Sequence, residues 1–336
     1  MKVSELGEFG LIELLAKMVS SSQKKHLAPW QNLIVGIGDD AAAWQGDASI
    51  QLATVDSFIQ DVHFLSGISS WKEIGWKALA VNLSDIAAMG GVPRYALVSL
   101  ALPGATDVED VTALYHGMID LAEQFEVAIV GGNVSNAPLI AINITVLGST
   151  RSQAKHILTR STAKPGDKIA VTGYVGTAAA GLEILTQQLQ IDPEANAYLK
   201  QAFLQPYPRI AEGQLLIEQG VKTAIDISDG LIADLNHICN ASQVGARIEV
   251  DCVPILPVVK ASFNDKALKL ALAGGEDYEL LFTASTDTID KVRTAVSCPV
   301  TVIGEIIAGK PGTTLIDSQG NPLDLGKAGW DHFATR

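Results

Sequence analysis

The segment Val127–Thr150, V-A-I-V-G-G-N-V-S-N-A-P-L-I-A-I-N-I-T-V-L-G-S-T, contains no charged residue. It is long enough to cross a bilayer, but three asparagines, a proline and two adjacent glycines interrupt it, which argues against a membrane span. Its second half alternates, so that Ile142, Ile144 and Val146 share one side of an extended chain. The pattern predicts two strands joined by a loop, over Val127–Val130 and Leu139–Leu147.

Periodicity on the N-terminal side of this segment predicts a mixture of helices and strands. Apolar residues recur at helical spacing over Leu11–Val19, Lys72–Met89 and Val108–Phe125. Strand-like runs cover Ile50–Val55 and Tyr95–Leu102.

A polar segment follows residue 150 and ends in a turn signal at Ala163–Asp167. A new series of elements then begins, which places a domain boundary near residue 150. We expect two α+β domains with α/β-type layers, residues 1–150 and 151–336. The predicted strands of the second domain are Lys168–Thr172, Lys222–Ile227, Arg247–Val253, Glu279–Thr283 and Val300–Ile306. Its predicted helices are Thr177–Leu189, Arg209–Gln219, Leu231–Cys239 and Thr288–Val296.

Composition excludes several classes of protein. The chain has 336 residues, of which 48% are hydrophobic, which supports a large buried core and excludes a disordered chain. Its net charge of −13 excludes binding to a nucleic-acid backbone by neutralisation of phosphates. Three scattered cysteines argue against a disulfide framework, and the acidic N-terminus is unlike a signal peptide. We expect a cytoplasmic protein that does not bind membranes.

Carboxylates gather in turns and apolar segments of this chain. They occur in Gly36–Asp40, at Asp56 in a strand-like run, in Asp226–Gly230 and in Gly274–Asp277, and Asp85 lies within an apolar helix. Charges in apolar surroundings are costly unless they are paired or bound to metal, and few lysines or arginines lie nearby in the sequence. Mg²⁺ prefers oxygen ligands and usually binds one or two carboxylates together with the phosphates of a substrate. The pattern therefore favours several Mg²⁺ ions around a nucleotide.

Most of these carboxylates, and also His63 and Trp330, have a structural interpretation as well. Asp39 or Asp40 can cap a helix or a turn, and Asp226, Ser228 or Asp229 can cap the helix that follows them. His63 alone fits a satisfied core histidine, and Trp330 fits a packing anchor. Asp85 cannot be explained as a cap, because it lies in the middle of a predicted helix.

Two phosphate-binding motifs are only apparent. Gly36–Ala41 fits a dinucleotide fingerprint, but two carboxylates would face the pyrophosphate and no helical pattern follows. Gly304–Lys310 matches a Walker A motif, but Pro311 follows in place of a hydroxyl residue. We therefore assign the function to neither motif.

Eight segments in order resemble the thiamine-monophosphate kinase family, whose superfamily includes aminoimidazole ribonucleotide synthetase and selenophosphate synthetase. They cover nearly the whole chain. The segments are G-E-F-G-L-I (Gly7–Ile12), G-I-G-D-D (Gly36–Asp40), A-V-N-L-S-D-I-A-A-M-G (Ala80–Gly90), L-T-R-S (Leu158–Ser161), K-P-G-D (Lys164–Asp167), D-I-S-D-G-L (Asp226–Leu231), G-G-E-D-Y-E-L (Gly274–Leu280) and G-W-D-H-F (Gly329–Phe333).

The resemblance implies ATP-dependent phosphorylation of thiamine monophosphate to thiamine diphosphate. It implies a homodimer in which the N-terminal domains, which bind ATP and Mg²⁺, pair around a barrel-like sheet. It assigns Asp40, Thr54, Asp56, Asp85, Asp226 and Asp229 to Mg²⁺. It assigns Gly132, Asn133, Arg160 and Ser228 to ATP, and His63, Glu276 and Trp330 to the substrate.

The chemistry agrees with this assignment. A phosphate monoester is already largely anionic at neutral pH, so the nucleophile needs no general base and we expect no catalytic residue in that sense. Catalysis is then positioning and neutralisation of charge. Trp330 is suited to stack on the cationic thiamine rings, and Glu276 to offset their charge.

Three residues depart from the family pattern. Asn133 stands in place of a metal-binding carboxylate in the G-G-D-T-T loop, Val55 in place of a hydroxyl residue, and His156 in place of an arginine. We expect weaker binding of one metal ion. A non-catalytic or weakly active homologue and another ATP-using enzyme of the superfamily remain the alternatives, although the first cysteine, Cys239, lies too late for selenophosphate synthetase.

Overall fold

The computed structural model describes residues 1–22, 28–35, 37, 43–44, 46, 49–65, 67–151 and 156–323. The chain divides into two compact units. The first comprises Met1–Ile86 and Gly91–Gln153, and the second Ala87–Gly90 and Ala154–Arg336. Each is α+β, as the sequence predicted. Among the described residues, no helix has both the length and the apolar character needed to cross a membrane.

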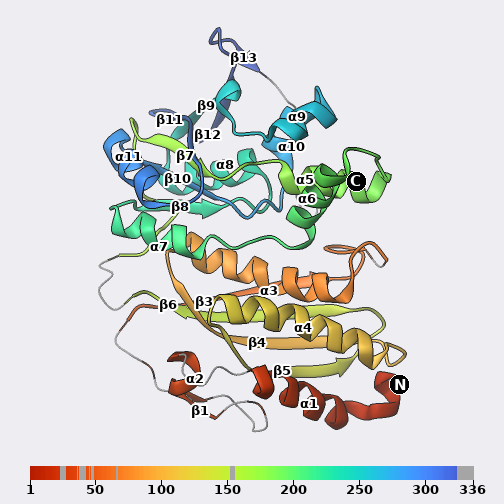
Figure 1. Cartoon of the computed structure of the whole chain (residues 1–336). Helices are drawn as coiled ribbons and strands as arrows, with labels where there is room; N and C mark the ends of the chain where they lie inside the picture. The colour runs from red at the N-terminus through yellow and green to blue at the C-terminus, as the bar shows by residue number, and fades with distance from the viewer. Residues whose placement is uncertain are drawn as a thin grey trace. The chain divides into compact units, whose positions relative to one another are not determined.

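The first unit is built on a four-stranded sheet among the described residues, in the order β3-β6-β4-β5. Strands β4 and β5 are parallel, and the other neighbouring pairs are antiparallel. Helices α3 and α4 lie along the sheet (Figure 1). The elements are α1 (Val3–Ser22), α2 (Ala28–Asn32), β1 (Leu33–Val35), β2 (Ala43–Trp44), β3 (Gln51–Ile59), α3 (Trp71–Ala88), β4 (Val92–Leu102), α4 (Val108–Gln124), β5 (Ala128–Asn136) and β6 (Ala141–Ser149).

Two glycines allow α3 and α4 to pack closely. A Cβ atom on Gly75 of α3 would lie 1.9 Å from the carbonyl oxygen of Leu114, and one on Gly117 of α4 would lie 1.8 Å from that of Lys72. No side chain fits at either position, so the backbones of the two helices are in direct contact. This contact fixes α3 against the unit's core.

The two faces of this sheet differ. The predicted alternation in β6 is confirmed, because Ile142, Ile144 and Val146 are fully buried. On the opposite face, Trp30, Leu33 and Trp44 pack against a small cluster of Tyr95, Ala128 and Val130, while Val55 of β3 is 62% exposed. Part of this outer face is therefore open in a single chain.

The second unit contains a seven-stranded sheet among the described residues, in the order β13-β12-β9-β11-β7-β10-β8. One hydrophobic core joins the sheet to α5, α8, α9 and α10. The strands are β7 (Lys168–Thr172), β8 (Thr223–Asp226), β9 (Gly245–Glu249), β10 (Leu280–Ala284), β11 (Val300–Ile307), β12 (Gly312–Ile316) and β13 (Pro322–Leu323). The helices are α5 (Thr177–Gln187), α6 (Pro193–Leu204), α7 (Ile210–Glu218), α8 (Leu231–Ser242), the 3₁₀ turn η1 (Val250–Cys252), α9 (Pro257–Phe263), α10 (Lys266–Ala273) and α11 (Thr286–Ala295).

The predicted elements are all present, with shifted ends. β5 continues through Gly131–Asn136, where we expected a loop, because this segment pairs with β4. The helices α2, α6, α9 and α10 and the strands β1, β2, β12 and β13 were not predicted, and Val250–Cys252 of the predicted strand Arg247–Val253 forms the 3₁₀ turn η1 instead. Gly304–Ile307 forms part of β11 rather than a phosphate-binding loop, which confirms the rejection of that motif.

Candidate functional site

Thr54 and Asp56 of β3 form one candidate group with residues of α3. Both are half-buried and lie on the same face of the strand as the buried Leu52 and Phe58. The hydroxyl of Thr54 donates a hydrogen bond to Oδ2 of Asp85 at 2.5 Å. The structure therefore brings together three of the four predicted metal ligands of the first unit; the fourth, Asp40, lies outside the described residues.

Asn82 of α3 holds the backbone of this group in place. It is fully buried, and its Oδ1 accepts a hydrogen bond from the N–H of Asp56 at 3.0 Å. Its Nδ2 donates to the carbonyl of Ala78 at 3.1 Å. Because both ends of the amide are used, Asn82 fixes β3 and α3 relative to each other next to Asp85.

His63 follows β3 and packs against Phe58, with ring centroids 5.9 Å apart. Its Nδ1 lies 3.0 Å from the backbone N–H of Ile59. A backbone N–H can only donate, so Nδ1 is the acceptor and the neutral ring carries its proton on Nε2. The interpretation of His63 as a satisfied histidine thus agrees with the hydrogen bond at Nδ1.

Gly132 and Asn133 are not part of this group within one chain. They are exposed residues of β5, which occupies the opposite edge of the sheet from β3. Asn133 pairs with Ser99, and across the sheet Ser99 is followed by Asn143 and Ser57. Three strand spacings separate β5 from β3, which is about 14 Å.

In the second unit, the D-I-S-D-G segment forms the turn between β8 and α8. Asp226 ends β8 and is 3% exposed, while Ser228 and Asp229 are half-buried. We considered these residues as caps of the following helix, but α8 begins after Gly230 and no side chain caps it at that position. The capping interpretation is therefore wrong for this helix.

Asp234, the fourth residue of α8, was not predicted as a site residue. Its side chain accepts the hydrogen bonds that the backbone N–H groups of this turn donate. Its Oδ2 accepts hydrogen bonds from the N–H groups of Ser228, Asp229 and Gly230 at 3.0, 3.1 and 3.1 Å. Burial raises its pKa to about 8, with further contributions from the charges of Asp226 and Asp229. An aspartate in an apolar helical run, as at Asp85, was the sequence signal that could have found it.

Asp229 of the turn and Asp234 and His237 of α8 have ligand atoms within 4.8 Å of one another. Asp234 is buried and His237 is exposed. With Asp226, this end of α8 thus concentrates three carboxylates, which fits a preference for cations over anions.

The G-G-E-D-Y-E-L segment is tied to the same turn. The N–H of Glu276 donates to the carbonyl of Ser228 at 2.8 Å, and that of Tyr278 to the carbonyl of Ile227 at 2.9 Å. Glu276 has φ of 69°, a costly conformation for a residue with a side chain that is typical of functional sites. The structure thus brings two predicted residues, Ser228 and Glu276, together.

Asp277, next to Glu276, caps a different helix. Its two carboxylate oxygens accept hydrogen bonds from the N–H groups of Gly176 and Ala178, at 2.6 and 3.0 Å, at the start of α5. Burial raises the pKa of Asp277 to about 7, and these hydrogen bonds oppose the shift. Asp277 therefore has a structural role, whereas Glu276 beside it is half-buried.

The third carboxylate of this segment, Glu279, is buried and is neutralised within the unit. It accepts two hydrogen bonds from the guanidinium of Arg209, at 2.7 and 2.5 Å, and one from the hydroxyl of Thr172 at 2.6 Å. Because these donors occupy its oxygens, we do not assign Glu279 to a ligand.

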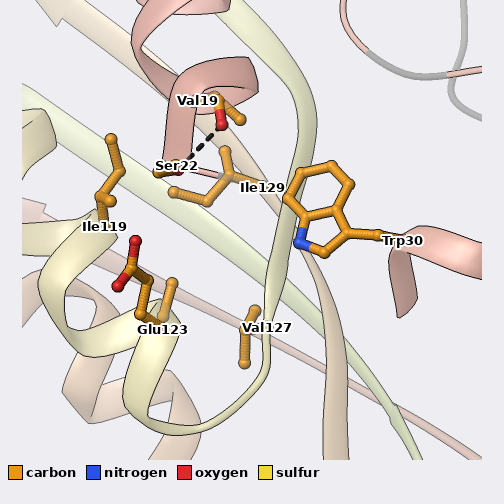
Figure 2. A pocket seen from close by; sticks show the side chains of 8 residues that line it. Val19, Ser22, Trp30, Ile119, Glu123, Val127 and Ile129 are labelled. Carbon is orange, nitrogen blue, oxygen red and sulfur yellow. Dashed lines mark hydrogen bonds between the residues drawn. The ribbon is translucent and has the colours of Figure 1, made fainter. Parts of the chain in front are cut away.

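The structure gives fewer contacts for the remaining predicted site residues. Arg160 has an exposed side chain, and its carbonyl accepts a hydrogen bond from Ser242 of α8 at 2.8 Å. Trp330 lies outside the described residues. A pocket in the first unit, lined mainly by apolar residues of α1, α4 and β5 together with Trp30, contains no predicted site residue (Figure 2).

Comparisons with known proteins extend over the whole chain. Residues 38–150 match the family AIR synthase related protein, N-terminal domain, and residues 164–317 match its C-terminal domain. A thiamine-monophosphate kinase from Salmonella typhimurium is 38% identical over 335 residues, which cover 98% of this chain and 99% of that protein. One from Bacillus subtilis is 36% identical and covers 89% and 93% of the two chains.

Solved structures agree. The crystal structure of thiamine-monophosphate kinase from Stenotrophomonas maltophilia K279a superimposes with a TM-score of 0.80 at 34% identity, covering 90% of this chain and 95% of that one. The structure described as AaThiL complexed with AMPPCP and TMP gives 0.75 at 32% identity, covering 99% of both chains. Hydrogenase maturation protein HypE, at 19% identity and a TM-score of 0.72, shares the fold.

Proposed function

This chain belongs to the thiamine-monophosphate kinase family, and we propose that it carries out that reaction, phosphoryl transfer from ATP to thiamine monophosphate, with the residues described above. The observation that carries the function is 38% identity over nearly the full length of a curated kinase of this name. The D-I-S-D-G turn and the Thr54–Asp85 pair support the assignment of residues to roles.

The acceptor is a phosphate group, which is largely dianionic at neutral pH. We therefore propose no general base in the chain. The residues have two tasks, to hold donor and acceptor in line and to reduce the repulsion between two polyanions.

Oxygen ligands of the chain fit Mg²⁺. Half-buried Thr54, Asp56 and Asp85 in the first unit, together with Asp40, offer the hard donors that this ion prefers, and Asp226 and Asp229 offer them in the second. When bound, Mg²⁺ supplies neutralisation of the charge on the phosphate oxygens.

The nucleotide and substrate contacts follow the same division. We assign Gly132, Asn133, Arg160 and Ser228 to ATP. We assign His63, Glu276 and Trp330 to thiamine monophosphate, where Glu276 offsets the positive charge of the thiazolium and Trp330 stacks on the rings. Asn133 lies on β5, at the opposite edge of the sheet from β3 and its candidate metal ligands. We therefore assign it to the nucleotide first and to a metal ion second.

We also propose a homodimer through the first unit. The outer face of its sheet carries the exposed Val55 and the polar row from Ser57 to Asn133. A second copy of this face can cover Val55 and complete a barrel-like sheet. In this arrangement residues 1–150 form the ATP-binding and dimerisation domain, and residues 151–336 form the C-terminal domain.

A cytoplasmic location is part of the proposal. The three cysteines are free thiols, which suits a reducing compartment.

An assay of ADP release with and without thiamine monophosphate tests the function. We expect release that depends on the substrate and stops when a chelator removes Mg²⁺. Undiminished turnover in excess chelator would contradict the metal assignment. Binding of ATP or thiamine monophosphate without turnover would instead favour the weakly active or non-catalytic homologue that Asn133 and Val55 suggest.

A further inference from the structure

We infer that Asp234 is a positioning residue, which holds the Ile227–Gly230 turn so that it contacts the nucleotide and its cations through side chains and not through backbone N–H groups. The inference rests on the proposed roles of Ser228 and Asp229 and adds a residue that neither the sequence motifs nor the comparisons assign.

The start of a helix usually attracts anions, because its first N–H groups have no partner within the helix. In the turn just before α8, the backbone N–H groups are already occupied. One oxygen of Asp234 accepts hydrogen bonds from three consecutive N–H groups, those of Ser228, Asp229 and Gly230. Asp234 is 1% exposed, so these N–H groups are bound by a buried carboxyl group of the chain itself.

The other backbone groups of the turn are also used. The N–H of Ile227 donates to the carbonyl of Glu279 at 2.8 Å, and the carbonyls of Ile227 and Ser228 accept from Tyr278 and Glu276. The turn is thus held from one side by α8 and from the other by the Glu276 segment. A phosphate has no N–H group left to bind among Ile227–Gly230.

What the turn can offer a ligand is therefore its side-chain oxygens. Ser228 and Asp229 are both half-buried, and their direction follows from the backbone that Asp234 fixes. Carboxylate and hydroxyl oxygens bind hard cations, and cations bridge such a surface to phosphates. This turn therefore works in the opposite way to a glycine-rich loop that cradles phosphates with N–H groups.

The test compares Asp234→Asn with a matched control, Asp192→Asn. Asp192 also accepts hydrogen bonds from two backbone N–H groups at a helix start, those of Glu194 and Ala195 at the start of α6, but it lies in no predicted motif. Both variants lose a capping carboxylate, so a general effect of a weakened cap appears in both.

The first readout is hydrogen exchange in the full-length protein without ligands. We expect faster exchange of the amides of Ser228, Asp229 and Gly230 in Asp234→Asn and unchanged exchange there in Asp192→Asn. The second readout is binding of Mn²⁺ with a non-hydrolysable ATP analogue, measured by electron paramagnetic resonance. We expect Asp234→Asn to weaken it about tenfold, as for other residues that orient metal ligands.

Steady-state kinetics separate positioning from general damage. In Asp234→Asn we expect the KM for ATP and the Mg²⁺ concentration for half-maximal rate to rise about tenfold, with the KM for thiamine monophosphate within about twofold of wild type. Asp234→Glu keeps a carboxyl group and should restore part of the loss; it also replaces Asp234→Asn as the test variant if Asp234→Asn does not fold.

Two results would overturn the inference. One is Mn²⁺–nucleotide binding in Asp234→Asn equal to that of wild type, and the other is an equal loss in Asp192→Asn. The inference can be tested even if the proposed function fails. In a protein that binds Mn²⁺ and nucleotide but does not phosphorylate thiamine monophosphate, hydrogen exchange and Mn²⁺–nucleotide binding still measure the effect of Asp234→Asn.

Discussion

The hydroxyl of Thr54 and the carboxylate of Asp85, 31 residues apart in the sequence, meet at 2.5 Å where β3 faces α3. The hydroxyl is the donor, so Asp85 takes part through a carboxylate oxygen, the kind of atom that also binds a cation. This pair is the most direct structural support for a metal site in the first unit.

Asp85→Asn should lower the rate of ADP release with thiamine monophosphate by at least about a hundredfold, because a neutral amide is a poor Mg²⁺ ligand. The fold should remain, since the amide oxygen can still accept from Thr54. The control is Asp120→Asn on α4, where the carboxylate forms an exposed ion pair with Lys72 at 2.6 Å. An unchanged rate in Asp85→Asn would exclude Asp85 as an essential ligand.

His63→Asn should raise the KM for thiamine monophosphate about tenfold, the size of one hydrogen bond, and leave the KM for ATP unchanged. Asparagine can reproduce the acceptor that Nδ1 offers to Ile59 but not the imidazole ring that we assign to the substrate. His116→Asn, at an exposed position on α4, is the matched control. A KM for the substrate equal to that of wild type would remove His63 from the substrate site.

Asn133→Asp should lower the Mg²⁺ concentration needed for half-maximal rate, because it restores a carboxylate where the family has one. Ser135→Asp is the control, as Ser135 is also exposed and lies two residues further along β5. Titration of the rate with Mg²⁺ compares the two variants. No change, or a higher requirement, would show that residue 133 does not face the metal ions.

Asp277 should make the protein less stable as pH rises from about 4 to about 7. Its folded pKa of about 7 lies above the unfolded value of about 3.9, so the folded state binds the proton more tightly. The contribution of Asp277 to the free energy of unfolding is fully present below the pKa of the unfolded state. It is lost as pH rises through the pKa of the folded state, by up to about 1.4 kcal/mol per pH unit.

Urea unfolding at several pH values measures this effect. The free energy of unfolding of wild type relative to Asp277→Asn should fall between pH 4 and pH 7 and level off above it. Asp192→Asn, which removes the charge of an exposed helix cap, should show no such trend. A difference between wild type and Asp277→Asn that is independent of pH would mean that Asp277 is ionised throughout.

The sequence predicted those features that depend on local patterns. Alternation found β6, and an aspartate in an apolar helix pointed to Asp85. Helix α6 was missed because only Leu199, Phe203 and Leu204 of its residues are buried, which leaves a weak apolar stripe. The continuation of β5 through two glycines depends on its pairing with β4, which no local pattern reveals.

The candidate site could be predicted by residue type but not by arrangement. The motifs named Ser228 and Glu276 separately, and the hydrogen bond between their backbones joins segments 48 residues apart in numbering (276 − 228). The role of Asp234 was hidden because its partners are backbone groups, which carry no sequence signal. The separation of Asn133 from β3 follows from strand order, which depends on the whole sheet.

The placement of β3 and β5 at opposite edges of one sheet also bears on how this protein can evolve. A replacement at position 133 changes an exposed side chain without disturbing the Thr54–Asp85 pair or the amide of Asn82 behind it. A change of residue at position 133 therefore needs no compensating change in β3 or in the helix that carries Asp85.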